Sequence, residues 1–198
     1  YSQNEISSGI WSRESNRGFE LKNKIVGIIG YGNTGKSFAK KLSGFGMKIF
    51  FYDLIKDKGD KYATETSLKK IQQNCDIISI HTSLTKTSVG LINKSFISCC
   101  KKSFWLINTS RGQCVVTKDI INAIEQGKIL GAALDVIDLE KKSFNELTHK
   151  LKSEPKLLDY INSKKIILTP HVAGWTHESK INLSKIILKK IKNLKLLK

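Results

Sequence analysis

Long apolar runs and paired cysteines are missing from this chain of 198 residues. No apolar run approaches the ~18 to 20 residues that a membrane-spanning helix needs, and no secretory signal opens the chain. The four cysteines form neither a CxxC motif nor the pair of pairs typical of a zinc site; they are Cys75, Cys99, Cys100 and Cys114. Together these absences predict a cytoplasmic protein with free thiols, no metal site and no membrane partner.

Arginine is also scarce, since three Arg stand beside 31 Lys in a chain of formal net charge +17. A charge of this size suggests a nucleic-acid partner. The lysines are spread over most of the chain, however, without a recognition-helix or aromatic-stacking motif among them. We interpret them as solvated surface from a composition bias and expect no nucleic-acid partner. The scarcity makes Arg111 informative, because it places a planar, two-pronged cation at one motif position.

The chain lacks an initiator methionine: it begins at Tyr1, and Met47 is its one methionine. Residues 1–21 are polar and rich in turn-forming residues. We therefore expect the chain to be a piece entered midway, with sequence upstream lost or removed.

What the chain does have is a glycine-rich turn between two apolar runs. The turn reads Gly30-x-Gly32-x-x-Gly35, and the second run ends at Asp53. In a dinucleotide-binding unit the first glycine permits the tight turn, the second lets the backbone approach a pyrophosphate, and the third lets the helix pack on the sheet. A carboxylate at the spacing of Asp53 meets the adenosine ribose. Strand, turn, helix, strand and acid thus all occur in the expected order.

Apolar runs alternate with helix-like segments along the whole chain. Strands are predicted at 25–30, 48–52, 76–80, 104–108, 130–135 and 165–169. Helices are predicted at 34–45, 66–73, 117–126 and 176–195, with shorter pieces near 94–99 and 145–160. Strands that are apolar on both faces and alternate with helices imply a parallel sheet covered on both sides. The predicted fold class is α/β: a doubly wound, mostly parallel Rossmann sheet of six to seven strands.

The C-terminal residues 185–198 form a basic amphipathic pattern. Such a helix can lie on an anionic membrane, but more often its apolar stripe covers a hydrophobic core, and we favour the second interpretation. Thr176 is the predicted N-cap of this helix, and Glu178 in the first turn complements its dipole.

Polar residues follow three consecutive predicted strands. Arg111 follows 104–108, Asp135 and Glu140 follow 130–135, and His171 follows 165–169. Ligands of open parallel sheets bind outside the carboxyl ends of the strands, at the edge that also carries the glycine turn. Each residue alone has a structural explanation as a surface ion pair, a solvated acid or a turn histidine. Their joint placement predicts a catalytic group.

These segments resemble the NAD-binding domain of the D-isomer-specific 2-hydroxyacid dehydrogenases over nearly the whole chain. The similarity rests on the glycine turn with Asp53, on Asn108-Thr-Ser-Arg-Gly112, on Ala133-Leu-Asp-Val136, and on Thr169-Pro-His171 followed by Gly174. The stretches 141–144 and 173–179 are similar to bacterial proteins labelled phosphoglycerate dehydrogenase. This finer resemblance makes 3-phosphoglycerate a candidate substrate and serine biosynthesis a candidate pathway.

The resemblance implies a role for each matching residue. His171 is expected to protonate the keto oxygen, Glu140 to stabilise its imidazolium, and Arg111 to hold the substrate carboxylate. NAD is the implied cofactor, because Asp53 would face a 2′-phosphate, although nearby Lys56 leaves NADP open. The expected cofactor contacts are Gly30, Gly32, Asn33, Thr34, Gly35, Asp53, Thr109, Ser110, Asp135, Val172, Ala173 and Gly174. Asp135 is expected at the carboxamide side of the nicotinamide.

The resemblance also implies a domain plan. Residues 1–21 match an inter-domain leader, 22–175 the dinucleotide-binding domain, and 176–198 a C-terminal helix packing on that domain or leaving it. The substrate domain is largely absent, so we expect the chain alone to bind NAD but to turn over a 2-hydroxy acid poorly. A homodimer through the nucleotide-binding domains is implied as well.

Three departures from the family pattern stand out. Ser83 replaces a common proline and is expected to loosen the loop near the adenosine, Lys141 replaces the proline after the catalytic acid, and the stretch from Glu140 to His171 is long. None of these departures removes a catalytic group. Two alternatives stay open: a non-catalytic NAD(H)-sensing interaction module, and an inactive remnant of such an enzyme.

Overall fold

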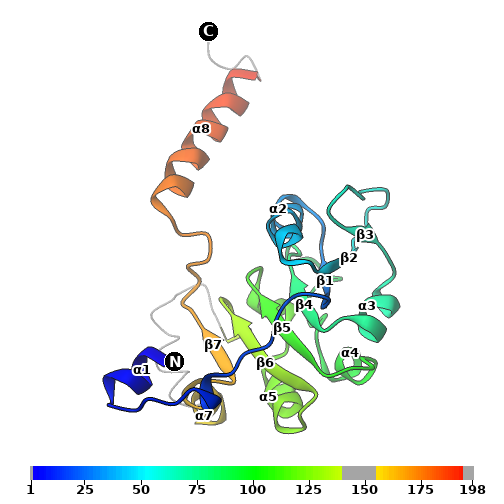
Figure 1. Cartoon of the computed structure of the whole chain (residues 1–198). Helices are drawn as coiled ribbons and strands as arrows, with labels where there is room; N and C mark the ends of the chain where they lie inside the picture. Colours follow the sequence, from blue (N-terminus) through cyan, green and yellow to red (C-terminus); the bar gives the residue numbers. More distant parts are fainter. Residues whose placement is uncertain (1, 140–154, 194–198) are drawn as a thin grey trace.

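The computed structural model describes residues 2–139 and 155–193, which contain a sheet of seven strands that pair in parallel (Figure 1). The strand order is β3-β2-β1-β4-β5-β6-β7. The strands are β1 (Ile25–Ile29), β2 (Lys48–Tyr52), β3 (Thr64–Glu65), β4 (Ile77–Ile80), β5 (Phe104–Asn108), β6 (Ile129–Leu134) and β7 (Ile166–Leu168). The predicted Rossmann sheet is confirmed. The edge strand β3 was not predicted, because its two residues are too short for a pattern.

Helices connect the strands as the crossovers of a parallel sheet require. The α-helices are α1 (Ser2–Ser7), α2 (Asn33–Leu42), α3 (Leu68–Asn74), α4 (Lys94–Ser98), α5 (Thr117–Glu125), α7 (Pro155–Asn162) and α8 (His177–Asn193). Short 3-10 turns are η1 (Glu14–Asn16), η2 (Ser43–Phe45) and η3 (Gly112–Cys114). The helix predicted near 145–160 corresponds to α7 in its second part, and residues 145–154 lie outside the described residues. Helix α1 falls in the segment expected to be turn-rich.

The strands β1 and β2 are buried on both faces, because alternate side chains of a strand point to opposite sides. Val26 and Ile28 pack with Ala39 of α2 in a smaller core. Ile29 and Phe50 belong to a larger core, to which α3, α4, α5 and α7 contribute from the other face. The glycine turn therefore sits between two packed layers.

Coverage of the second face does not extend across the sheet. Trp105 of β5 and Ile167 of β7 are 40% and 52% exposed, and both alternate with residues of the larger core. The expectation of a sheet covered on both sides is thus correct for β1 and β2. Among the described residues it is wrong at β5 and β7, because α2 packs over β1, β2 and the adjoining β4.

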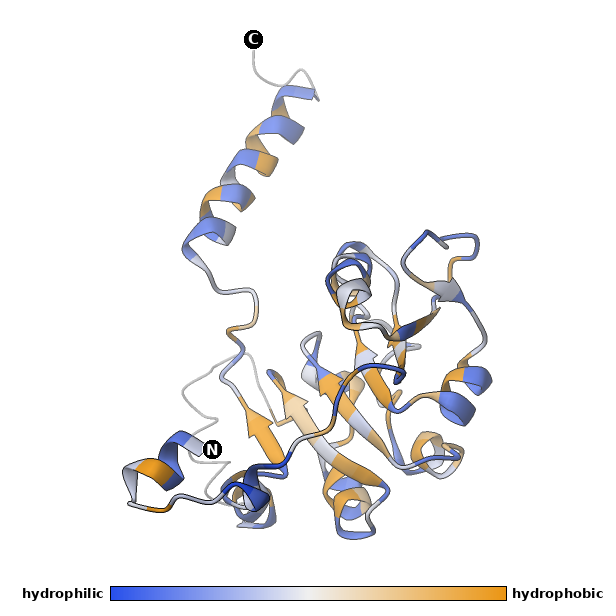
Figure 2. Cartoon of the chain, viewed as in Figure 1, coloured by the Kyte–Doolittle hydropathy of each residue, from blue (hydrophilic) through white to orange (hydrophobic). Residues whose placement is uncertain are grey.

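Helix α8 projects away from the sheet (Figures 1 and 2) and has no buried residue. Ile181 and Leu183 of this helix are 55% and 62% exposed. The expectation that this segment covers the core is therefore wrong for its described residues, since the chain leaves the sheet before the helix begins. The predicted cap is confirmed: the Ser179 amide donates to Oγ1 of Thr176 at 3.0 Å. None of the helices in the described residues is long and apolar enough to cross a membrane.

Candidate active site

The glycine turn after β1 needs glycine at its first and third positions. Gly30 has φ +92°, and a Cβ there would lie 2.7 Å from the carbonyl oxygen of His81. A Cβ on Gly35 would lie 2.2 Å from the carbonyl oxygen of Gly30. Such contacts exclude any side chain, so both glycines allow α2 to begin directly against the ends of β1 and β4.

Gly32, the middle glycine of the turn, has different surroundings. A Cβ on Gly32 would meet nothing within 4 Å, so the backbone there faces open space. Helix α2 begins at Asn33, and no side chain caps its first amides. Thr34 and Asn33 are exposed. A helix start with unused amides and open space before it is the arrangement that receives a pyrophosphate.

A cavity of about 460 Å³ opens beside this turn. Its lining includes Gly30, Gly32 and Asp53 from the predicted set, together with Lys58 and His81, which the sequence analysis did not select. The other predicted cofactor residues lie outside this lining. The cavity thus lies at the ends of β1, β2 and β4, where the sequence predicts the adenosine side of a dinucleotide site, and the ends of β5, β6 and β7 lie beyond it along the same edge.

Asp53 directs its carboxylate into the glycine turn. Oδ2 accepts from the Tyr31 amide at 2.7 Å, and Oδ1 accepts from the Ile55 amide at 2.9 Å and from Lys58 Nζ at 3.2 Å. Burial favours a higher pKa for Asp53, but the two amides and Lys58 outweigh it, so its pKa lies below the ordinary value. The carboxylate is therefore ionised at neutral pH and is fixed before any cofactor binds.

His81, at the carboxyl end of β4, forms the floor of the turn. Its amide donates to the Ile29 carbonyl at 2.8 Å, and its Nε2 lies 2.9 Å from Oγ of Ser79. Burial lowers the pKa of His81 to about 4, so the ring is neutral at physiological pH. Its position after a strand that faces the glycine turn is the sequence signal that could have selected it.

The loop after β4 is held although Ser83 replaces the proline common in the family. Oγ of the buried Ser88 donates to the Ser83 carbonyl at 2.7 Å and accepts from the Thr85 amide at 2.8 Å. These hydrogen bonds join residues within the loop and so counteract the loosening expected from Ser83.

The carboxyl ends of β5, β6 and β7 lie side by side. Asn108 pairs with Leu134, and Leu134 pairs with Leu168. The Asp135 amide continues the ladder to the Asn108 carbonyl at 2.9 Å, and the Thr169 amide continues it to the Leu134 carbonyl at 3.0 Å. Arg111, Asp135 and His171 therefore follow three strands that end at one continuous edge of the sheet.

Asp135 holds the turn that carries His171. Its carboxylate accepts from Oγ1 of Thr169 at 2.5 Å, from the Val172 amide at 2.8 Å and from the Ala173 amide at 2.8 Å. Its carbonyl accepts from the His171 amide at 2.8 Å. Burial opposes ionisation, but these donors and the nearby His171 place the pKa of Asp135 below its ordinary value.

His171 has φ +56°, a left-handed conformation that is uncommon outside glycine. Such a conformation persists where the surroundings fix it, as at functional sites. Here the bonds to Asp135 on both sides of the residue fix the turn. The flanking Val172 and Gly174 are exposed at the same edge.

The loop after β5 is organised by the buried Asn108. Its Oδ1 accepts from the Ser110 amide at 3.0 Å and from Ser110 Oγ at 2.8 Å, and its Nδ2 donates to the Arg111 carbonyl at 3.1 Å. Ser110 is buried, Thr109 and Arg111 are exposed, and Nη1 of Arg111 donates to the Ser110 carbonyl at 2.7 Å. The loop thus presents the guanidinium outward while its backbone is fixed from below.

Gly112 joins this loop to the one after β6. A Cβ there would lie 1.9 Å from the Ile137 carbonyl oxygen, which no side chain permits. Asp138, one residue on, accepts from the Thr117 amide at 3.0 Å at the start of α5. Glu140, the predicted partner of His171, lies outside the described residues, as does the neighbouring Lys141.

Comparisons with known proteins show which family the chain resembles. The family model "D-isomer specific 2-hydroxyacid dehydrogenase, NAD binding domain" matches residues 1–173. The chain is 35% identical to a glyoxylate reductase of Thermococcus litoralis over 88% of its length and 50% of that protein. It is 32% identical to a D-3-phosphoglycerate dehydrogenase of Bacillus subtilis, over 90% of the chain and 32% of that protein.

A crystal structure of D-lactate dehydrogenase from Aquifex aeolicus, complexed with NAD and lactic acid, superposes with a TM-score of 0.81. It is 30% identical, and the match covers 97% of this chain and 60% of that one. The chain spans about half the length of the first curated relatives it matches. By its family match, the chain belongs to the D-isomer specific 2-hydroxyacid dehydrogenases and comprises their NAD-binding domain.

Proposed function

We propose that this chain is the cofactor-binding and catalytic half of an oxidoreductase that interconverts a small 2-hydroxy acid and its 2-keto acid. The observation that carries the proposal is the joint anchoring of Arg111 and His171 after β5 and β7, the two strands that flank β6 at one edge of the sheet. Asp135 holds the turn of His171, Asn108 holds the loop of Arg111, and the Asp135 amide bonds the Asn108 carbonyl. The edge that presents both groups also carries the glycine turn.

The cofactor fits the residues of this edge. The free amides at Asn33 and Thr34 and the open backbone at Gly32 suit a pyrophosphate, and Asp53 suits the adenosine ribose. Thr109, Ser110 and residues 172–174 would line the nicotinamide side, with Asp135 beneath them. NAD, when bound, supplies the carbon that accepts or donates the hydride.

Each catalytic residue then has one task. Arg111 binds the substrate carboxylate with its fork of donors and polarises the carbonyl. His171 gives a proton to the keto oxygen during reduction and takes it from the hydroxyl during oxidation. Glu140, which lies outside the described residues, would stabilise the protonated form of the His171 ring, as the family resemblance implies.

The substrate is a small 2-hydroxy acid, and 3-phosphoglycerate is our first candidate. Residues 141–144 and 173–179 support it by their resemblance to bacterial phosphoglycerate dehydrogenases, and a D-3-phosphoglycerate dehydrogenase is among the relatives. Relatives named for glyoxylate and D-lactate make these the next acids to test. We further propose a homodimer through the nucleotide-binding domains.

Two variants test the proposal. Asp53→Ala should weaken NADH binding by roughly tenfold, since a charge-assisted hydrogen bond to the ribose is lost. In a protein that includes residues 1–198, His171→Gln should reduce 2-keto acid turnover by about 10² to 10⁴ while NADH affinity changes less than about twofold. NADH fluorescence titration and steady-state reduction of 3-phosphohydroxypyruvate, glyoxylate and pyruvate are the measurements.

Equal losses of binding and turnover in His171→Gln would mean that His171 is structural and would defeat the catalytic assignment. Normal NADH binding with no turnover of any 2-keto acid, in a protein that also has a substrate domain, would favour the NAD(H)-sensing module instead.

A further inference from the structure

A lysine lies inside the adenosine cavity, next to the acid that would read the ribose. Nζ of Lys58 is 3.2 Å from Oδ1 of Asp53, and the two side chains are 25% and 13% exposed. Both residues line the cavity of about 460 Å³. The carboxylate that would repel a 2′-phosphate is therefore already paired with a cation.

The pairing leaves the acid able to bind a ribose. A carboxylate has about four acceptor positions. Three of those on Asp53 are used, by the amides of Tyr31 and Ile55 and by Lys58. One position remains for a ribose hydroxyl, so Lys58 changes the charge of this corner without removing its hydrogen-bond acceptor.

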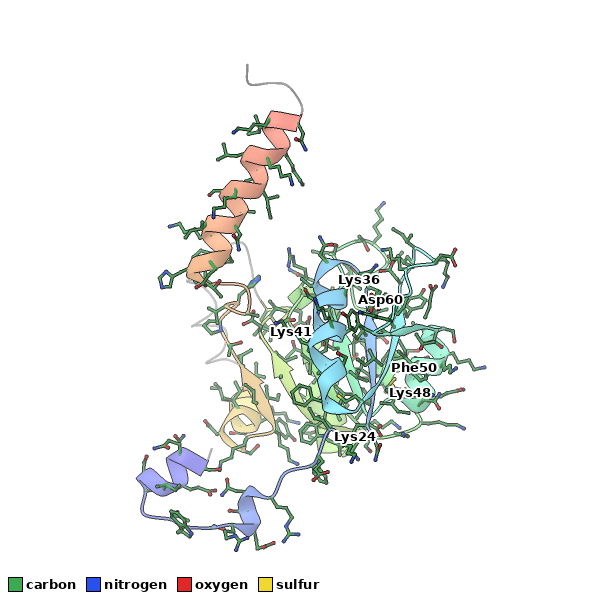
Figure 3. All side chains as sticks on the ribbon, turned by 45° about the horizontal axis from the view of Figure 1, so that its top comes forward. Lys24, Lys36, Lys41, Lys48, Phe50 and Asp60 are labelled. Carbon is green, nitrogen blue, oxygen red and sulfur yellow. The ribbon has the colours of Figure 1, made fainter. Side chains whose placement is uncertain are left out.

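The segment that carries Lys58 is fixed at both ends by Tyr31. The Tyr31 amide donates to Asp53, and the Tyr31 hydroxyl donates to Oδ1 of Asp60 at 2.9 Å. The Tyr31 ring is buried and stacks on Phe51, with centroids 3.8 Å apart. Asp60 also lies near Lys36 of α2 (Figure 3). The ammonium of Lys58 is thus presented by an anchored loop.

Lys56, which the sequence suggested for a 2′-phosphate, is placed differently. Its Nζ pairs with Glu65 at 3.6 Å, lies over the Tyr52 ring at 5.3 Å, and its side chain is 61% exposed. It is not among the residues that line the cavity. The candidate cation for a 2′-phosphate is therefore Lys58 and not Lys56, which lies two residues earlier in the same loop.

We propose that Lys58 sets the cofactor selectivity of this chain. It neutralises Asp53 and offers a cation to a 2′-phosphate, so that the chain binds NADP in addition to NAD. This inference rests on the proposed function, because it assumes that the cavity holds the adenosine ribose. An unpaired Asp53 would face a group of about −1.5 to −2 charges, the usual charge of a phosphate monoester near pH 7. With Lys58 present the corner is close to neutral, and the ammonium can turn from Asp53 to the phosphate.

A matched pair of variants tests the role of Lys58. Lys58→Met and Lys56→Met each remove one ammonium from the same loop and keep an unbranched apolar stem. NAD and NADP are titrated separately against the chain of residues 1–198, by calorimetry, at low and at high salt. Lys58→Arg is the rescue variant, and thermal unfolding checks that each variant is folded.

We expect Lys58→Met to raise the ratio of the NADP to the NAD dissociation constant by about tenfold, through weaker NADP binding, with NAD within about twofold. Lys56→Met should leave the ratio unchanged, Lys58→Arg should keep it near the original value, and high salt should shrink the difference. An unchanged ratio in Lys58→Met beside normal NAD affinity would overturn the assignment to Lys58, as would an equal change in Lys56→Met. Failure of the unsubstituted chain to bind NAD would instead overturn the proposed function, and this inference with it.

Discussion

The proposed adenosine side and the proposed catalytic side of this edge are built in different ways. On the proposed adenosine side, the glycine turn, Asp53 and the loop after β4 line a cavity at the ends of β1, β2 and β4. On the catalytic side, Arg111 and the residues after His171 are exposed, and what is fixed is the backbone beneath them.

Each side depends on one carboxylate with three donors, and the two acids differ in burial. Asp53 lines a cavity and its side chain is 13% exposed, whereas Asp135 is 4% exposed. The comparison shows that the binding side is organised around space for a ligand. The proposed catalytic side is organised around a fixed backbone, with Arg111 exposed and His171 partly buried. The following variants test this contrast.

Gly112→Ala should have the largest effect. A Cβ 1.9 Å from the Ile137 carbonyl oxygen forces the loops after β5 and β6 apart, and we expect a loss of about 4 kcal/mol in the free energy of unfolding. Gly44→Ala is the matched control, since a Cβ there would meet nothing within 4 Å. Urea unfolding measures both, and similar values for the two variants would show that the loops are not tightly joined.

Asp135→Ala should have the second largest effect, a loss of about 3 kcal/mol in the free energy of unfolding. The hydroxyl of Thr169 and two backbone amides lose a buried acceptor. Asp53→Ala removes as many bonds at a more accessible place, where water can replace the carboxylate, and should cost about 1 kcal/mol. If Asp53→Ala proved as destabilising as Asp135→Ala, the contrast between the two sides would fail. Urea unfolding at pH 7 provides the comparison.

His81 should make the adenosine side sensitive to acid. Its pKa of about 4 in the folded chain lies below the unfolded reference near 6.5. The unfolded state therefore binds more protons between these values, and stability falls as the pH drops from 6.5 towards 4. The loss between pH 7.5 and 4.5 should be about 2 kcal/mol smaller in His81→Gln than in the original chain.

His177→Gln, at an exposed position on α8, is the control that also removes one imidazole. The same drop in His81→Gln as in the original chain would mean that the buried ring does not resist protonation.

Tyr31→Phe should have the smallest effect, a loss of about 1 kcal/mol in the free energy of unfolding. It removes the hydroxyl that bonds Asp60 and keeps the hydrogen bond from the Tyr31 amide to Asp53. A double-mutant cycle with Asp60→Ala should give a coupling energy of about 1 kcal/mol. Additive losses would show that Tyr31 and Asp60 do not anchor the loop of Lys58.

Much of the fold was predictable because its signals are local. Most strands are continuous apolar runs, and those near 25–30 and 104–108 were predicted within a residue of β1 and β5. The glycine turn was predictable for the same reason, since each glycine has a role set by its neighbours. The sequence could not predict β3, because a two-residue edge strand exists through its pairing with β2. Nor could it place α8, whose apolar stripe does not say what it contacts.

The candidate site was predictable in part. Arg111, Asp135 and His171 were found because the carboxyl ends of parallel strands meet at one edge. Lys58 was missed in favour of Lys56, since only the path of the loop decides which ammonium faces the cavity. The hydrogen bonds from residues 169–173 to Asp135 were not predicted either, because they join segments that are 34 or more residues apart.

By itself, the sequence determined the order of strands and helices and the chemistry available at each strand end, because hydrophobic period and turn residues act over a few positions. Tertiary structure alone decided which carboxylate supports which loop and which cation enters the cofactor cavity. Those outcomes depend on distances between strands that are neighbours in space and remote along the chain.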